Sequence, residues 1–172
     1  MAAFLMGEHA ELTLTSTGPK HTEAIGRFVG ESLSPGCALA LIGTLGAGKT
    51  MFARGVAFGN RIPADCTVSS PTFALVNEYP GTLTLFHLDA YRLSGGLELD
   101  ALGFDEMCES GGAVMVEWAD RVEECIPNDH LRIDFEVLAE DTRTLRFTAM
   151  GPQSSQIVKK LEQTAQSLLE SI

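Results

Sequence analysis

An apolar run of strand length, CALALIG at positions 37–43, opens directly into a glycine-rich segment that ends in Lys49. The residues after it, TMFARGVAF at positions 50–58, repeat apolar side chains at the spacing of a helix. A continuously apolar strand is typical of a sheet that is covered on both faces. The order strand, glycine loop, helix therefore favours an α/β protein whose glycine segment lies at the carboxyl end of an interior strand.

The glycine segment GTLGAGKT, positions 43–50, fits the phosphate-binding pattern G-x-x-x-x-G-K-[ST]. Glycine tolerates positive φ, so successive N–H groups between Gly46 and Thr50 can converge on phosphate oxygens at the positive end of the helix. Lys49, the only lysine between positions 20 and 159, can bridge the β- and γ-phosphates, and the Thr50 hydroxyl can ligate Mg²⁺. The predicted nucleotide-binding residues are Gly43, Thr44, Leu45, Gly46, Ala47, Gly48, Lys49, Thr50 and Met51.

A phosphate loop needs an acidic side chain at the end of a neighbouring strand, to hold Mg²⁺ through Thr50 or to orient an attacking water. Asp89 follows the run LTLFHL and Glu117 follows the run AVMV. The runs alone do not rank the two acids, and either carboxylate can instead be a strand end that faces solvent. His87 lies two residues before Asp89 on the same side of a strand, where it can polarise that carboxylate or a water, or pack in the core.

The segment VSSPTF at positions 68–73, called here the hydroxyl loop, lies after the glycine-loop helix and carries two candidate γ-phosphate sensors, Ser70 and Thr72. The alternative is an ordinary connection in which proline restricts the backbone. Trp118, the only tryptophan, directly follows Glu117 and is either a packing residue or a side chain that closes the site.

The 172 residues fit one domain, with positions 1–10 as a loose N-terminal extension and 153–172 as a C-terminal helix. We expect a three-layer α/β fold like that of P-loop NTPases, with a mixed parallel/antiparallel sheet flanked by helices. The remaining predicted elements are a strand at 11–15, a helix from about 19 to 33, a hairpin at 74–89 around Pro80-Gly81, a mostly helical segment at 94–112, a strand at 113–118, two strands in HLRIDFEVL and RTLRFTAM, and a last helix at 154–169.

Charge and composition restrict the class of partner. The formal net charge of −11 repels polyanions and disfavours unaided binding to nucleic acid, whereas it favours a basic protein partner. The four cysteines show no C-x-x-C pairing and lie in or beside apolar segments, as reduced, buried thiols do. Because no basic leader precedes an apolar run and no segment is long enough to span a bilayer, we expect a cytoplasmic protein without membrane contact.

With these residues in view, the chain resembles the TsaE (YjeE) family through GTLGAGKT, SSPTFALVNEY, FHLDAYRL and VEW, which occur in that order. The resemblance covers roughly residues 11–150. It implies a P-loop ATPase that hydrolyses Mg-ATP within the complex that makes threonylcarbamoyladenosine in tRNA, with ATP and Mg²⁺ as ligands. It also implies a TsaD-like transferase and a TsaB-like subunit as partners that activate hydrolysis. The protein would then contact tRNA only indirectly, through this complex.

The resemblance also assigns roles to individual residues. Thr50 and Glu117 would be magnesium ligands, Asp89 an acid that positions water, and Thr72 part of a switch-like loop, with Lys49 on the phosphates. Adenine would lie near the start of the first helix, which makes Thr22 a candidate contact. The family commonly has Asp at the position of Thr44 and Thr at the position of Met51, so this chain departs from the family at two positions and has no acid inside the loop.

Two other functions stay open at this point. A small-molecule kinase is also a short phosphate-loop chain, but such enzymes usually begin with the loop and carry an arginine-rich lid. A noncatalytic nucleotide-gated assembly module would bind ATP without turning it over. A GTPase is disfavoured because the chain contains no N-K-x-D motif.

Overall fold

The computed structural model describes residues 9–170 and the side chains of residues 9–165. Its strands are β1 (Glu11–Ser16), β2 (Ala38–Ile42), β3 (Val76–Tyr79), β4 (Leu85–Asp89), β5 (Ala113–Glu117), β6 (Leu131–Val137) and β7 (Arg143–Ala149). Its α-helices are α1 (Pro19–Glu31), α2 (Lys49–Gly59), α3 (Gly96–Ala101), α4 (Phe104–Glu109) and α5 (Pro152–Glu170), with short 3-10 helices at Ala119–Arg121 and Glu123–Cys125. No helix in the described part of the chain is long and apolar enough to cross a membrane.

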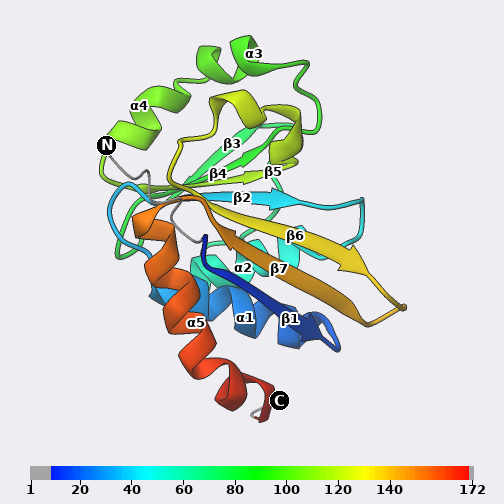
Figure 1. Cartoon of the computed structure of the whole chain (residues 1–172). Coiled ribbons are helices and arrows are strands. Elements are labelled where there is room, and N and C mark those ends of the chain that lie inside the picture. The colour runs from blue at the N-terminus through cyan, green and yellow to red at the C-terminus, as the bar shows by residue number, and fades with distance from the viewer. Residues whose placement is uncertain (1–8, 171–172) are drawn as a thin grey trace, which may run out of the picture.

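Within residues 9–170 the strands form one sheet in the order β1-β7-β6-β2-β5-β4-β3 (Figure 1). Strands β6, β2, β5 and β4 run parallel in the middle, whereas β7, β1 and β3 add antiparallel edges. The mixed sheet predicted from the sequence is therefore confirmed. Because the parallel strands end at the same edge, that edge collects the loop after β2 and the last residues of β4 and β5.

Helices cover both faces of the sheet: α1, α2 and α5 lie on one face, and α3 and α4 lie beyond the other (Figure 1). Each face has its own apolar core, since side chains alternate along a strand. In β2, Leu39 and Leu41 join the core under α1 and α2, whereas Ala38 and Ala40 join the other. These two cores explain why the run CALALIG is apolar at every position.

Helices α1 and α2 cross in backbone contact through glycines. A Cβ atom added at Gly30 would lie 2.1 Å from the Val56 carbonyl oxygen, and one at Gly55 would lie 2.0 Å from the Glu23 carbonyl oxygen. Gly26 and Gly59 make equally close approaches within the same crossing. This close crossing therefore fixes the start of α2, where the glycine loop ends, against α1.

Most predicted elements occur where the sequence indicated, including the hairpin, the helical segment at 94–112 and the interior strand after it. The first helix ends at Glu31 instead of about position 33, and the 3-10 turns after Trp118 were not predicted. All four cysteines are free thiols, but only Cys37 is fully buried. The predicted loose extension at 1–10 falls mainly on residues 1–8, which lie outside the described residues, as do the last two residues of the predicted C-terminal helix.

Candidate functional site

A cavity of about 410 Å³ lies at the edge of the sheet where the parallel strands end. The glycine loop follows β2 into this cavity, and Asp89 and Glu117 close β4 and β5 beside it. The antiparallel strand β7 begins at the same edge with Arg143. The lining residues are Pro19, Leu45, Gly46, Ala47, Gly48, Lys49, Thr50, Met51, Ser70, Thr72, Asp89, Tyr91, Glu117, Trp118 and Arg143.

The glycine loop has the backbone of a phosphate cradle. Gly46 and Gly48 have φ values of 77° and 104°, in the left-handed region that only glycine enters easily. Gly48 is the N-cap of α2, and the first N–H groups of this helix, like those of any helix, have no intrahelical acceptors. The residues that carry them, Lys49, Thr50 and Met51, line the cavity. These donors, together with the helix dipole, favour an anionic ligand.

The Lys49 ammonium lies inside the loop, and the residue as a whole is 5% exposed. It donates to the carbonyl oxygens of Gly43 at 2.6 Å and Thr44 at 2.9 Å, and it lies 3.9 Å from the centre of the Trp118 ring. Burial lowers the pKa of Lys49 from its ordinary value, and the negative charge of Glu117 is the strongest influence that opposes this shift. A phosphate would supply the negative charge that two neutral carbonyls do not.

Glu117 faces Thr50 across the cavity floor. The Thr50 hydroxyl lies 3.3 Å from each carboxylate oxygen of Glu117, and the carboxylate is almost fully buried. The sequence left open whether His87 polarises Asp89 or a water, or packs in the core; its ring is buried, and its Nε2 lies 2.8 Å from Glu117 Oε1. The reason is the register of the parallel pair: His87 stands opposite Met115, so the diagonal residue within its reach is Glu117 on the next strand.

Asp89 is held by the hydroxyl loop. Ser70 Oγ donates to Asp89 Oδ2 at 2.7 Å, and Thr72 Oγ1 donates to the same oxygen at 3.2 Å. The other carboxylate oxygen accepts the Tyr91 backbone N–H at 2.9 Å. The two acids therefore have different partners. Glu117 accepts a hydrogen bond from Thr50 at the start of α2, whereas Asp89 accepts hydrogen bonds from the hydroxyl loop.

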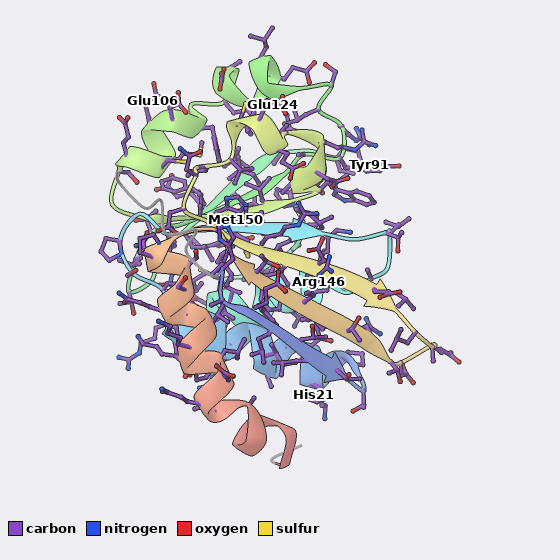
Figure 2. All side chains as sticks on the ribbon, viewed as in Figure 1. His21, Tyr91, Glu106, Glu124, Arg146 and Met150 are labelled. Carbon is purple, nitrogen blue, oxygen red and sulfur yellow. The ribbon has the colours of Figure 1, made fainter. Side chains whose placement is uncertain are left out.

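Trp118 closes one side of the cavity. Its backbone is left-handed, with φ of 58°, a conformation that is uncommon for a bulky residue and that concentrates at functional sites. This turn places the indole over the Lys49 ammonium and 4.8 Å from the Tyr91 ring. Tyr91 lies beside the 3-10 segment that follows β5 (Figure 2). The sequence left open whether Trp118 packs or closes the site; it lines the cavity.

Not every predicted binding residue reaches the cavity. Gly43 and Thr44 lie in the loop but are absent from the lining, and their carbonyl groups hold Lys49 instead. Thr22 is fully buried, and its hydroxyl is 2.8 Å from Ser16 Oγ and donates to the Gly18 carbonyl. Thr22 lies beside the glycine loop, with its methyl carbon 3.6 Å from the place of a Cβ atom on Gly48, and its contact with adenine stays a prediction. Pro19, at the start of the same helix, does line the cavity.

The sequence reading missed Arg143, a buried arginine in the cavity wall. Its position, far along the chain from the glycine loop and next to an acidic turn at Glu140-Asp141, gave no local motif. The pairing of β7 with β6 and β1 is what brings it to the end of the parallel strands.

Comparison with known proteins identifies the family. The family sequence model described as "Threonylcarbamoyl adenosine biosynthesis protein TsaE" matches residues 16–145. The chain belongs to the TsaE family. It is 38% identical over 152 residues to the Bacillus subtilis tRNA threonylcarbamoyladenosine biosynthesis protein TsaE, covering 88% of this chain and 94% of that protein. The Treponema pallidum TsaE is 37% identical over 130 residues, covering 76% and 95%.

A solved TsaE-like structure has the same fold. The crystal structure of Bacillus subtilis YdiB matches with a TM-score of 0.79 and 33% identity, over 92% of this chain and 98% of that chain. This match confirms the predicted α/β fold of the P-loop NTPase type. It also confirms the resemblance to TsaE that the ordered segments GTLGAGKT, SSPTFALVNEY, FHLDAYRL and VEW indicate.

Proposed function

We propose that this TsaE-family protein binds and hydrolyses Mg-ATP, and that it does so in the biosynthesis of threonylcarbamoyladenosine in tRNA. The observation that carries the proposal is the meeting of Lys49, Thr50 and Glu117 around one cavity, from two different elements. A glycine cradle with a buried cation suits a phosphate chain, and a hydroxyl opposite a carboxylate offers the oxygen ligands that Mg²⁺ prefers. The names of the relatives support the pathway.

In this proposal Thr50 and Glu117 hold Mg²⁺, and His87 keeps one oxygen of Glu117 engaged so that the other faces the ligand. The bound ion would screen the charge of the β- and γ-phosphates. Lys49 binds the phosphates from within the loop. Trp118 covers the ammonium and limits the access of water to it.

Asp89 is the acid proposed to orient the attacking water. It projects beside Glu117 from the neighbouring strand, and both of its oxygens are already fixed by donors from Ser70, Thr72 and the Tyr91 backbone. A change in the hydroxyl loop would therefore move the acid directly. This coupling supports a switch-like role for Thr72, since a loop that senses the γ-phosphate must be linked to the group that acts on it.

The partners that we propose are a TsaD-like transferase and a TsaB-like subunit, which activate hydrolysis and couple it to tRNA modification. The net charge of −11 supports docking to protein in preference to direct binding of tRNA, because each phosphate contact needs a local Lys or Arg. We expect the isolated protein to bind tRNA weakly. A tight, salt-sensitive complex with tRNA alone would contradict this part of the proposal.

ATP turnover by the assembled complex tests the function. We expect Lys49→Ala to abolish turnover and the matched control Lys160→Ala, an exposed lysine on α5, to leave it unchanged. Equal turnover by Lys49→Ala and the unmutated protein would refute the proposal. ATP binding without turnover in the complex would indicate a noncatalytic nucleotide-gated module, and phosphate transfer to a metabolite would indicate a kinase.

A further inference from the structure

Arg143 is a buried cation in the wall of the nucleotide cavity. It is 7% exposed and opens β7, where it pairs with Ser16 of β1 and Val137 of β6. Its guanidinium lies against the glycine loop: Nη1 is 2.8 Å from the place that a Cβ atom on Gly48 would take. A side chain at position 48 would therefore collide with this arginine.

The guanidinium has few partners for a group so deeply buried. Nη1 donates to the Ala47 carbonyl at 3.4 Å and Nη2 to the Glu140 carbonyl at 3.5 Å, both at the long limit of a hydrogen bond. Nε has no hydrogen-bond partner, and within the described residues no carboxylate forms an ion pair with Arg143. Buried charges are normally paired, because removing a charge from water is costly.

Arg143 and Lys49 approach the loop at different points. The Lys49 ammonium is held by the carbonyls of Gly43 and Thr44, at the beginning of the loop, whereas Arg143 meets Ala47 and Gly48, just before α2 begins. An anion that lies along the loop would therefore meet a second cation at the helix end. Arginine suits this position, because its rigid fork of donors matches the oxygens of a phosphate.

We infer that Arg143 is a binding residue that donates to a phosphate oxygen of the ligand held by the glycine loop. The inference rests on the proposed nucleotide binding and adds the group that completes it. It accounts for the absence of a protein counter-ion in the described part of the chain and for the burial of a charge beside a cavity. The phosphate is the counter-ion that the folded chain does not supply to Arg143.

Calorimetric titration of Mg-ADP tests this role with three variants of the full chain. Arg143→Met removes the charge, Arg143→Lys keeps the charge without the fork, and Arg146→Met is the control on the same strand. The Arg146 side chain, labelled in Figure 2, is 60% exposed, and it forms an ion pair with Asp134. We expect Arg143→Met to weaken Mg-ADP binding about 10- to 100-fold and Arg143→Lys to fall between it and the unmutated protein. Arg146→Met should bind as the unmutated protein does.

Two further readouts separate ligand binding from support of the fold. In urea unfolding without ligand, Arg143→Met should be as stable as the unmutated protein or more stable, because an apolar side chain replaces an unpaired buried charge. The affinity of the unmutated protein should also fall more steeply with added NaCl than that of Arg143→Met, which has lost one contact between charges.

Each result bears on the inference. Equal affinity of Arg143→Met and the unmutated protein overturns the inference and leaves the proposed function intact. If Arg143→Met loses as much free energy of unfolding as free energy of binding, Arg143 supports the fold and the inference is overturned. The same follows if Arg143→Met does not fold while Arg143→Lys binds normally. Equal salt dependence shows that the guanidinium does not meet a phosphate. No binding of Mg-ADP by the unmutated protein overturns both this inference and the proposed function.

Discussion

Gly30 lies where α1 and α2 cross. Its replacement by alanine has two opposite effects on stability: alanine has the higher helix propensity, but its Cβ atom does not fit between the helices. A Cβ atom at Gly30 would lie 2.1 Å from the carbonyl oxygen and 2.8 Å from the carbonyl carbon of Val56. Carbon and carbonyl oxygen ordinarily approach to about 3.3 Å, so the helices must separate locally by about 1 Å. The added Cβ atom would clash with backbone atoms of Val56 and Asn60, so no change of side-chain rotamer relieves the clash.

The two contributions differ in sign and in size. Propensity alone favours alanine over glycine inside a helix by about 1 kcal/mol. Overpacking a tight contact costs about 1–3 kcal/mol or more, and backbone that cannot rearrange belongs at the upper end. We therefore expect Gly30→Ala to lower the free energy of unfolding by about 1–2 kcal/mol. In a domain of this size this corresponds to a decrease in Tm of about 2–8 °C.

Urea unfolding followed by circular dichroism, with Trp118 fluorescence as a second probe, measures this change. Gly95→Ala is the control, because Gly95 precedes α3 in extended backbone, with φ of 165°, and no atom lies within 4 Å of its added Cβ. We expect the control to stay within about 0.5 kcal/mol of the unmutated protein. If Gly30→Ala is as stable as the unmutated protein, or more stable, as helix propensity alone predicts, the close crossing of α1 and α2 is refuted.

Three further predictions concern the site and the opposite face of the sheet. His87→Phe removes the 2.8 Å contact with buried Glu117, so we expect the free energy of unfolding in urea to fall by about 1.5–3 kcal/mol. An unchanged free energy of unfolding would show that the contact contributes nothing. Ser70→Ala removes the shortest bond to Asp89 and should lower kcat for ATP in the complex about tenfold with KM little changed, whereas a change in KM alone would place Ser70 in ground-state binding. Burial raises the pKa of the Cys108 thiol to about 11, so its alkylation at about pH 8 should be slower than that of free cysteine, and equal rates would contradict the burial.

The sequence carried enough information for the central part of the fold because that part is local. The strand, the glycine loop and α2 are contiguous, and the loop pattern requires that order. Asp89 and Glu117 were found because acids at the ends of parallel strands meet at one edge, whichever strands are neighbours. Ser70 and Thr72 were candidates because a loop with hydroxyl groups after the glycine-loop helix suits a γ-phosphate sensor; both line the cavity and donate to Asp89.

Features that depend on strand order and register were left open or missed. The role of His87 was left open between Asp89, a water and the core, and it is the pairing of β4 with β5 that directs its ring to Glu117. Arg143 escaped notice because β7 follows the loop by a long stretch of chain and reaches the site only through the order of the strands. Such contacts join segments that no short pattern links.

The central claim is that the glycine loop, with Lys49 inside it and Glu117 opposite, holds the phosphates of Mg-ATP. Calorimetric titration of ATP in the presence of Mg²⁺ into the unmutated protein tests it most directly. We expect saturable heat from one site per chain, and a much weaker isotherm when Mg²⁺ is withheld. Heat that does not exceed that of dilution would contradict the account.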